Sequence, residues 1–218
     1  MKKLFFSISL FITTLISGQT IPTVPYEFNN AESGLIEGKI ENLDNISTYK
    51  VYYNFKNIVV NGSTINAAGY VKESVYLKEY AKIIDEKQPG RGSSFKGSWE
   101  LGKDMFYRYE FEKNFGVGAK KELLLNQVDT NKVADCILVV EPVMFSPGGA
   151  PYIDAVFTFL KPSGVVLVSL FINRLYRITP GNSTYGIDTD FTSSFHKAGR
   201  FLTATIRKDR ESRGLKKR

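Results

Sequence analysis

The stretch CILVVEPVMFSPGGAPYIDAVFTFLKPSGVVLVSLFINRL, residues 136–175, predicts the centre of the fold. It contains three apolar runs of strand length, at 136–145, 152–160 and 165–175. The second connection, Lys161-Pro162-Ser163-Gly164, is a tight turn, because proline presets one backbone angle and glycine permits a positive one. Connections this short join antiparallel neighbours. The stretch therefore predicts three adjacent antiparallel strands.

The flanking segments add one more strand and three helices. Apolar and polar residues alternate from Tyr49 to Val60, which is typical of a strand with one covered face. Helical spacing predicts helices over 70–86, from Phe95 to about Asn114, and from a cap at 188–190 onward. The apolar stripe of the last helix consists of Phe191, Phe195, Ala198, Leu202 and Ile206. This order predicts an α+β fold: a mostly antiparallel sheet of about four strands with helices packed on one face.

The first residues have the layout of a secretory signal peptide. Lys2 and Lys3 precede an apolar run from 4 to 16, and the small residues Ser17 and Gly18 precede Gln19. The run is shorter than the roughly 20 residues that span a bilayer. We therefore expect a signal peptide at 1–18, a single α+β domain at 19–206 and a basic tail at 207–218. The protein would be exported to the periplasm or outer cell envelope of a bacterium.

The net charge of +7 does not indicate a nucleic-acid partner. Two of the positive charges belong to the signal peptide, and the tail carries seven basic and two acidic residues, so the body is neutral. The tail has no aromatic residue for base stacking. We expect it to be a solvated, frayed terminus. The alternative is that it makes weak contact with an anionic membrane surface.

No catalytic, metal or cofactor site is predicted. His196 is the only histidine and Cys136 the only cysteine, which is too few for a zinc site. A phosphate-binding loop is not indicated either, because Ser98 stands where the lysine should follow Gly97 and the segment does not follow a strand. An alternative is a carboxylate-dependent hydrolase that uses Glu100, Asp104 or Glu141.

Aromatic residues are concentrated between 95 and 115. A helix cannot bury every side, so some of them should be exposed and available to a partner or ligand. The candidate binding residues are Phe95, Trp99, Tyr107 and Phe111. Their alternatives are a thick core layer, or the wall of a cavity that carries a small apolar ligand.

Two segments resemble a family of uncharacterised exported proteins of Bacteroidetes-type bacteria. The first consists of 76–80 through 86–92, followed by Ser98-Trp99-Glu100. The second consists of 134–140 with Pro147-Gly148, and ends in the last helix with Lys197-Ala198-Gly199. More distantly, the strand after Asp135 and the hairpin around Gly164 resemble envelope domains of the DUF4410 and curli-secretion type. The resemblance implies an α+β domain that serves envelope complexes, and it transfers no catalytic residue. We therefore expect an exported envelope protein with a binding or assembly role and an envelope protein as its partner.

Overall fold

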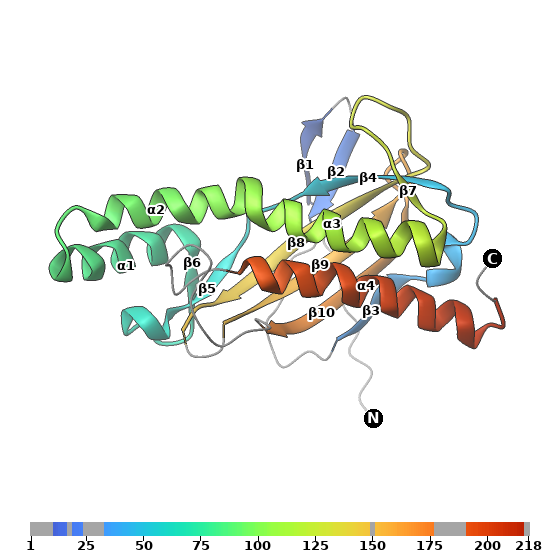
Figure 1. Ribbon diagram of the computed structural model, residues 1–218. Coiled ribbons are helices and arrows are strands. Elements are labelled where there is room, and N and C mark those ends of the chain that lie inside the picture. Colours follow the sequence, from blue (N-terminus) through green and yellow to red (C-terminus); the bar gives the residue numbers. More distant parts are fainter. Residues whose placement is uncertain (1–10, 17–18, 24–32, 149–150, 177–190, 216–218) are drawn as a thin grey trace.

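The computed structural model describes residues 11–16, 19–23, 33–148, 151–176 and 191–215 (Figure 1). Ser17 and Gly18, which precede the expected cleavage between Gly18 and Gln19, lie outside these ranges, as do most of the signal peptide and the cap at 188–190. The strands are β1 (Phe11–Ile16), β2 (Gln19–Thr23), β3 (Gly34–Gly38), β4 (Thr48–Tyr53), β5 (Val59–Asn61), β6 (Tyr70–Lys72), β7 (Asn126–Gln127), β8 (Cys136–Ser146), β9 (Tyr152–Leu160) and β10 (Val166–Tyr176). The helices are α1 (Glu73–Lys87), α2 (Arg91–Leu101), α3 (Arg108–Gly118) and α4 (Thr192–Ser212), with short 3₁₀ segments η1 (Ile40–Leu43) and η2 (Gly62–Ile65) and π-helical segments η3 (Gly102–Tyr107) and η4 (Ala119–Leu123).

The α+β class is as predicted, but the predicted sheet is wrong. The main sheet has eight strands, with β3-β10-β9-β8-β4-β7 as its path; off this path, β5 pairs with β8 and β6 pairs with β5. It is mixed: β8, β9 and β10 are antiparallel as expected, whereas β4 and β5 run parallel to β8. The chain reaches β8 from β4 through a long helical crossover, and such a connection permits parallel pairing. The strands β3, β6 and β7 were not predicted, because each has at most five residues; β6 occupies the first three residues of the helix predicted at 70–86, which begins at Glu73.

A proline in β8 explains why the expected strand 49–60 is split in two. β4 pairs with β8 as far as Tyr53 opposite Val140, and β5 resumes opposite Met144. Pro142 lies between these positions, at an irregularity in the β8–β9 register. Proline has no N–H to donate, so within a sheet it occurs at bulges and breaks. The result is a gap between two short strands along one edge of β8.

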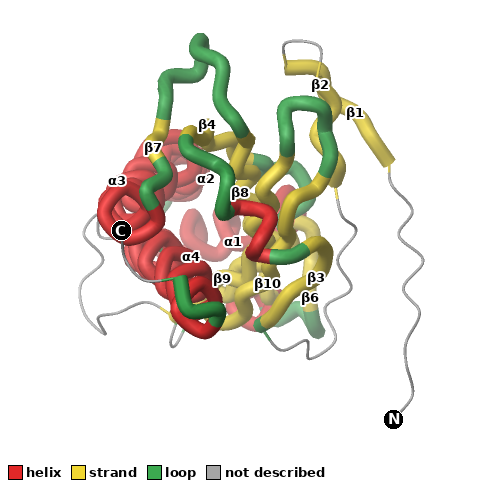
Figure 2. Tube along the Cα trace, turned by 90° about the vertical axis from the view of Figure 1, so that its right-hand side faces the viewer, coloured by secondary structure: helices red, strands yellow, loops and turns green. Residues whose placement is uncertain are grey.

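The helices cover one face of the sheet. Figure 2 shows helices on one side of the strands and the separate β1–β2 ladder on the other side. Tyr49, Leu138, Val140 and Phe157 point toward the helices and are fully buried in the main core. The predicted stripe of α4 is confirmed, because all five of its residues are fully buried. Apolar side chains of sheet and helices therefore form one core.

The second predicted helix is part of a longer rod. The backbone stays helical across the junctions of α2, η3 and α3, and the rod continues into η4. At roughly 1.5 Å per residue, residues 91–123 extend about 50 Å. In Figure 1, α1 and α2 form a hairpin that projects beyond the sheet, and α3 lies beside α4.

Candidate functional site

The outer side of the rod presents a line of exposed apolar residues. Leu101, Met105 and Tyr109 are 45 %, 56 % and 61 % exposed. On the opposite side, Trp99 and Tyr107 are almost fully buried. Large apolar side chains that gather on one exposed face are typical of interaction sites. We name Leu101, Met105 and Tyr109 the outer stripe.

The π-helical segment keeps the outer stripe in line. In an α-helix, residues four apart advance beyond a full turn, so a row of such residues drifts around the axis. A π turn closes its hydrogen bond at i→i+5 and holds more residues. The segment Gly102–Tyr107 therefore compensates for the drift between Leu101 and Tyr109. π-Helical insertions often occur at functional sites.

The four aromatic residues predicted to bind a partner lie on the core side of the rod. Phe95, Trp99, Tyr107 and Phe111 are all buried. Tyr107 stacks on Phe195 with 4.8 Å between ring centroids, Phe111 stacks on Phe157 at 5.6 Å, and Trp99 contacts Phe145 at 5.5 Å. They join the rod to the sheet and to α4, and a binding role for them stays a prediction. The exposed apolar residues of the same segment are Leu101, Met105 and Tyr109. The composition of the segment does not show which of its residues face outward.

Two cations lie beside the outer stripe. The Arg108 guanidinium lies over the ring of Tyr53, 5.2 Å from its centroid, and near that of Phe55 at 5.7 Å. It therefore anchors the rod to the edge of the sheet. The Lys113 ammonium lies 5.4 Å from the ring centroid of Tyr109. The end of the stripe thus combines an exposed phenol ring with a positive charge.

A buried ion pair lies at the start of the π-helical segment. Lys103 Nζ donates to both carboxylate oxygens of Glu73, at 3.0 and 3.1 Å, and Trp99 Nε1 donates to Glu73 Oε1 at 2.7 Å. Lys103 also pairs with Glu100 at 2.9 Å. Glu73 belongs to α1, and Trp99, Glu100 and Lys103 belong to the rod, so these contacts join α1 to the rod. This arrangement is structural, because its charges are satisfied internally.

The three candidate carboxylates of the hydrolase alternative are not brought together. Glu100 and Asp104 are exposed on the rod and pair with Lys103 and Arg108. Glu141 is buried on the sheet face that points away from the helices, where Asn54 Nδ2 donates to its Oε1 at 2.9 Å. Burial raises the pKa of Glu141 to about 7. A general acid needs a second group facing it, and neither of the other two acids is on that face.

The single histidine joins two helices. His196 Nδ1 lies 3.2 Å from Glu110 Oε2, and Asn114 Nδ2 donates to the same oxygen at 3.2 Å. The contact lies between α3 and α4 and leaves His196 partly exposed. Among the described residues, no group of three or more histidine, cysteine, aspartate or glutamate side chains is placed to hold a metal ion.

Within the described part of the chain, a pocket of about 540 Å³ lies at the C-terminal end of α4. Its wall includes Asp44, Glu122, Arg207 and Arg210, so this pocket is not the enclosed apolar cavity expected of a carrier of a small apolar ligand. Arg207 pairs with Glu122 at 2.8 Å, and Arg210 pairs with Asp44 at 3.2 Å. The charged wall consists of ion pairs within the chain.

The beginning of the basic tail is ordered, in contrast to our expectation of a frayed terminus. α4 continues to Ser212, six residues beyond the last apolar residue of its stripe. Arg213 pairs with Asp44 and Asp209, and its guanidinium holds the pKa of Asp44 below its usual range. The first basic residues of the tail therefore anchor α4 to the η1–β4 connection.

No family model, no curated protein and no solved structure matches this chain. The family resemblance therefore stays a prediction. Every helix within the described ranges is too short or too polar to cross a membrane.

Proposed function

We propose that this chain is an exported bacterial envelope protein that binds a partner protein through the outer stripe of its rod. One observation carries the binding role: Leu101, Met105 and Tyr109 are exposed in line, while the other side of the same rod forms the core. Exposing three large apolar side chains in one row is unfavourable unless something covers them. Met and aromatic residues are also enriched at protein interfaces.

The shape of the rod supports an elongated contact. The stripe occupies the middle of a helix about 50 Å long, so a partner can contact neighbouring turns on both sides of it. Stable interfaces bury about 800 Å² on each partner, which is more than three side chains supply. The partner therefore also contacts the polar residues that flank the stripe, such as Asp104 and Lys113.

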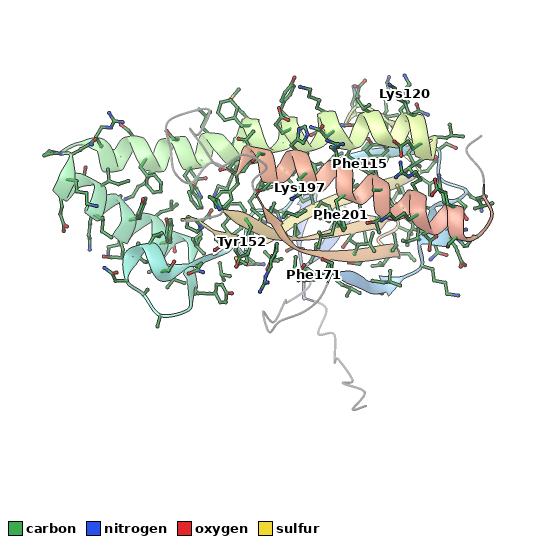
Figure 3. All side chains as sticks on the ribbon, turned by 60° about the horizontal axis from the view of Figure 1, so that its bottom comes forward. Phe115, Lys120, Tyr152, Phe171, Lys197 and Phe201 are labelled. Carbon is green, nitrogen blue, oxygen red and sulfur yellow. The ribbon has the colours of Figure 1, made fainter. Side chains whose placement is uncertain are left out.

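Site-specific photo-crosslinking in the native host tests the binding role. A photoreactive amino acid replaces Met105 on the stripe or Phe201 on α4, a matched position because Phe201 is a half-exposed apolar residue of another helix (Figure 3). We expect one defined adduct from position 105, none from position 201, and loss of the adduct on adding Tyr109→Asp. The proposal fails if both positions give the same adducts or if Tyr109→Asp changes nothing.

The export part of the proposal has its own measurement. The layout of residues 1–18 places cleavage after Gly18, so the envelope fraction should contain a chain that begins at Gln19. N-terminal sequencing of the protein from fractionated cells reads this residue directly. A chain that keeps Met1 in the envelope fraction would refute processing without affecting the crosslinking result.

A further inference from the structure

The end of the rod and α4 lie side by side and run in the same direction. Glu110 of α3 lies against His196 near the start of α4, and Glu122 of η4 pairs with Arg207 near its end. Both helices cover the same face of the sheet (Figure 1). Helices packed in this way share one outer side, which points away from the sheet.

Basic residues gather on this outer side. Lys197, Arg200 and Lys208 each follow a residue of the buried α4 stripe by two positions. Lys121 follows a buried residue of η4 in the same way, and Lys120 is exposed beside it. Two positions are about half a turn of a helix, so these side chains start on the side opposite the core. We name Lys120, Lys121, Lys197, Arg200 and Lys208 the basic face; Figure 3 labels Lys120 and Lys197.

The positive charge of the basic face is not neutralised by ion pairs. No carboxylate within the described part of the chain pairs with any of its five cations. Nearby acids have other partners, because Glu110 lies against His196 and Glu122 pairs with Arg207. On the α1–α2 hairpin, in contrast, exposed acidic residues at 85–86 directly precede an exposed lysine. The basic face is therefore a local excess of positive charge on a body that is neutral in total.

Two large apolar side chains are exposed among these cations. Val117 is 54 % exposed and precedes Lys121 by four positions, and Phe201 is 44 % exposed and follows Lys197 by four positions. Residues four apart are neighbours on a helix surface. Binding to a membrane surface strengthens with the apolar area that is buried and with the attraction of cations to anionic lipids. The outer side of α3, η4 and α4 supplies both.

The chemistry of this side fits an anionic lipid surface better than a nucleic acid. Four of its five cations are lysines, which act as point charges, whereas arginine provides the fork that binds phosphates and bases in a bidentate manner. Val117 has no ring on which a base could stack, but a membrane interface accepts aliphatic and aromatic side chains alike. From Lys197 to Lys208 the basic face extends roughly 17 Å along α4, and the second helix lies about 8–10 Å beside it. It is thus broad enough to lie on a plane.

We propose that the outer side of α3, η4 and α4 docks on an anionic lipid membrane, with the basic face against the lipid phosphates and with Val117 and Phe201 in the headgroup layer. This places membrane contact on the folded helices, whereas composition alone suggested the end of the tail. The basic face shares no residue with the outer stripe, and membrane docking does not depend on a partner protein. A lipid contact at position 201 yields no protein adduct, in agreement with the expected crosslinking result.

Vesicle binding of the full chain tests this proposal. Vesicles of phosphatidylcholine mixed with phosphatidylglycerol are compared with vesicles of phosphatidylcholine alone, by flotation at physiological salt. The face variant carries Lys121→Gln and Lys208→Gln, one exposed lysine from each helix. The matched control carries Lys78→Gln and Lys96→Gln, which remove the same charge from exposed positions of the α1–α2 hairpin.

We expect the parent to bind the anionic vesicles more tightly than the neutral ones. The face variant should bind them about 25-fold more weakly than the parent, because each lysine at an anionic surface strengthens binding about fivefold. The control should stay within about twofold of the parent, since salt screens charges more than about 8–10 Å from the membrane. A chain that ends at Leu215 loses the last three basic residues of the tail and should keep most of its binding. Equal weakening of the face variant and the control, complete loss of binding on shortening the tail, or no preference of the parent for anionic vesicles would each overturn the proposal.

A fluorescence measurement locates the contact. Val117→Trp places a second indole on the outer side, and its emission should shift to shorter wavelength when anionic vesicles are added. Trp99 is buried in the main core and contributes a constant signal. Double-stranded DNA at the same phosphate concentration should bind more weakly than the vesicles and cause no shift. Vesicle binding without a shift would assign the contact to another part of the chain, and tighter binding of DNA would assign this side to a nucleic acid; either result overturns the proposal.

Discussion

Close contact between α3 and α4 depends on two glycines, Gly199 on α4 and Gly118 on α3, and at Gly199 the facing atoms belong to the backbone. A Cβ on Gly199 would lie 2.7 Å from the backbone nitrogen of Phe115 and 2.8 Å from the carbonyl oxygen of Phe111. Both are backbone atoms, so the two helices would have to separate. Phe111 and Phe115 are fully buried on α3, and their packing against the sheet depends on this approach.

We expect Gly199→Ala to lower the free energy of unfolding by about 1–3 kcal/mol, because overpacking forces the helices apart. Urea unfolding followed by Trp99 fluorescence measures the change. Gly97→Ala is the matched control: Gly97 is inside α2 and a Cβ there meets no atom within 4 Å. That substitution should raise stability by about 0.5–1 kcal/mol, since alanine favours helix over glycine. If both variants change the free energy of unfolding equally, the close contact at Gly199 does not limit the packing of α3 on α4.

At the scale of elements, the end of α4 is held by one arginine that reaches two other segments, the end of η1 and the end of η4. Arg210 donates to the carbonyl oxygens of Leu43 and Leu123, at 3.1 and 2.7 Å, and pairs with Asp44. These carbonyls end η1 and η4, where helical oxygens have no partner within the helix. A residue that belongs by composition to a charged tail is therefore part of the folded domain.

Arg210→Ala should lower the free energy of unfolding by about 2 kcal/mol, because hydrogen bonds from a charged donor are each worth about 1.5–3 kcal/mol and some are replaced by water. Lys208→Ala on the exposed side of α4 should change it by less than about 0.5 kcal/mol. Thermal and urea denaturation of both variants give the comparison. If the Arg210→Ala protein is as stable as the Lys208→Ala protein, the contacts of Arg210 do not stabilise the folded domain.

At the scale of the whole molecule, the stability of the uncleaved chain should depend on the proton of Glu141. Burial raises the pKa of Glu141 from its ordinary value of 4.5 to about 7. Between these values the folded chain binds a proton that the unfolded chain releases. The free energy of unfolding therefore falls as pH rises through this window.

Glu141→Gln should flatten this pH dependence. A shift from 4.5 to about 7 corresponds to about 3 kcal/mol, so the variant should gain up to that amount over the parent between pH 4.5 and 8. The measurement is chemical denaturation of the full chain at several pH values. Parallel profiles for the parent and Glu141→Gln would mean that the carboxyl of Glu141 is hydrated.

Local patterns in the sequence determined much of the fold. Alternation predicted the core-facing side of β4 with Tyr49 and Tyr53, and helical spacing predicted the buried stripe of α4 from Phe195 to Ile206. Short turns predicted the antiparallel order of β8, β9 and β10. Periodicity and turn chemistry depend on neighbours in the chain, so they can be read without the tertiary structure.

Only the tertiary structure decided the rest, because it depends on contacts between distant segments. Parallel pairing of β4 with β8 is set by the path of the helical crossover, and the gap opposite Pro142 by the partner strand. The π turns of η3 change which side of the rod faces outward, so the exposed residues are Leu101, Met105 and Tyr109. Arg210 meets Asp44, 166 residues away, through folding alone. The charge and apolar content of a segment are local properties of the sequence. The partner of each side chain, in contrast, depends on segments that only folding brings together.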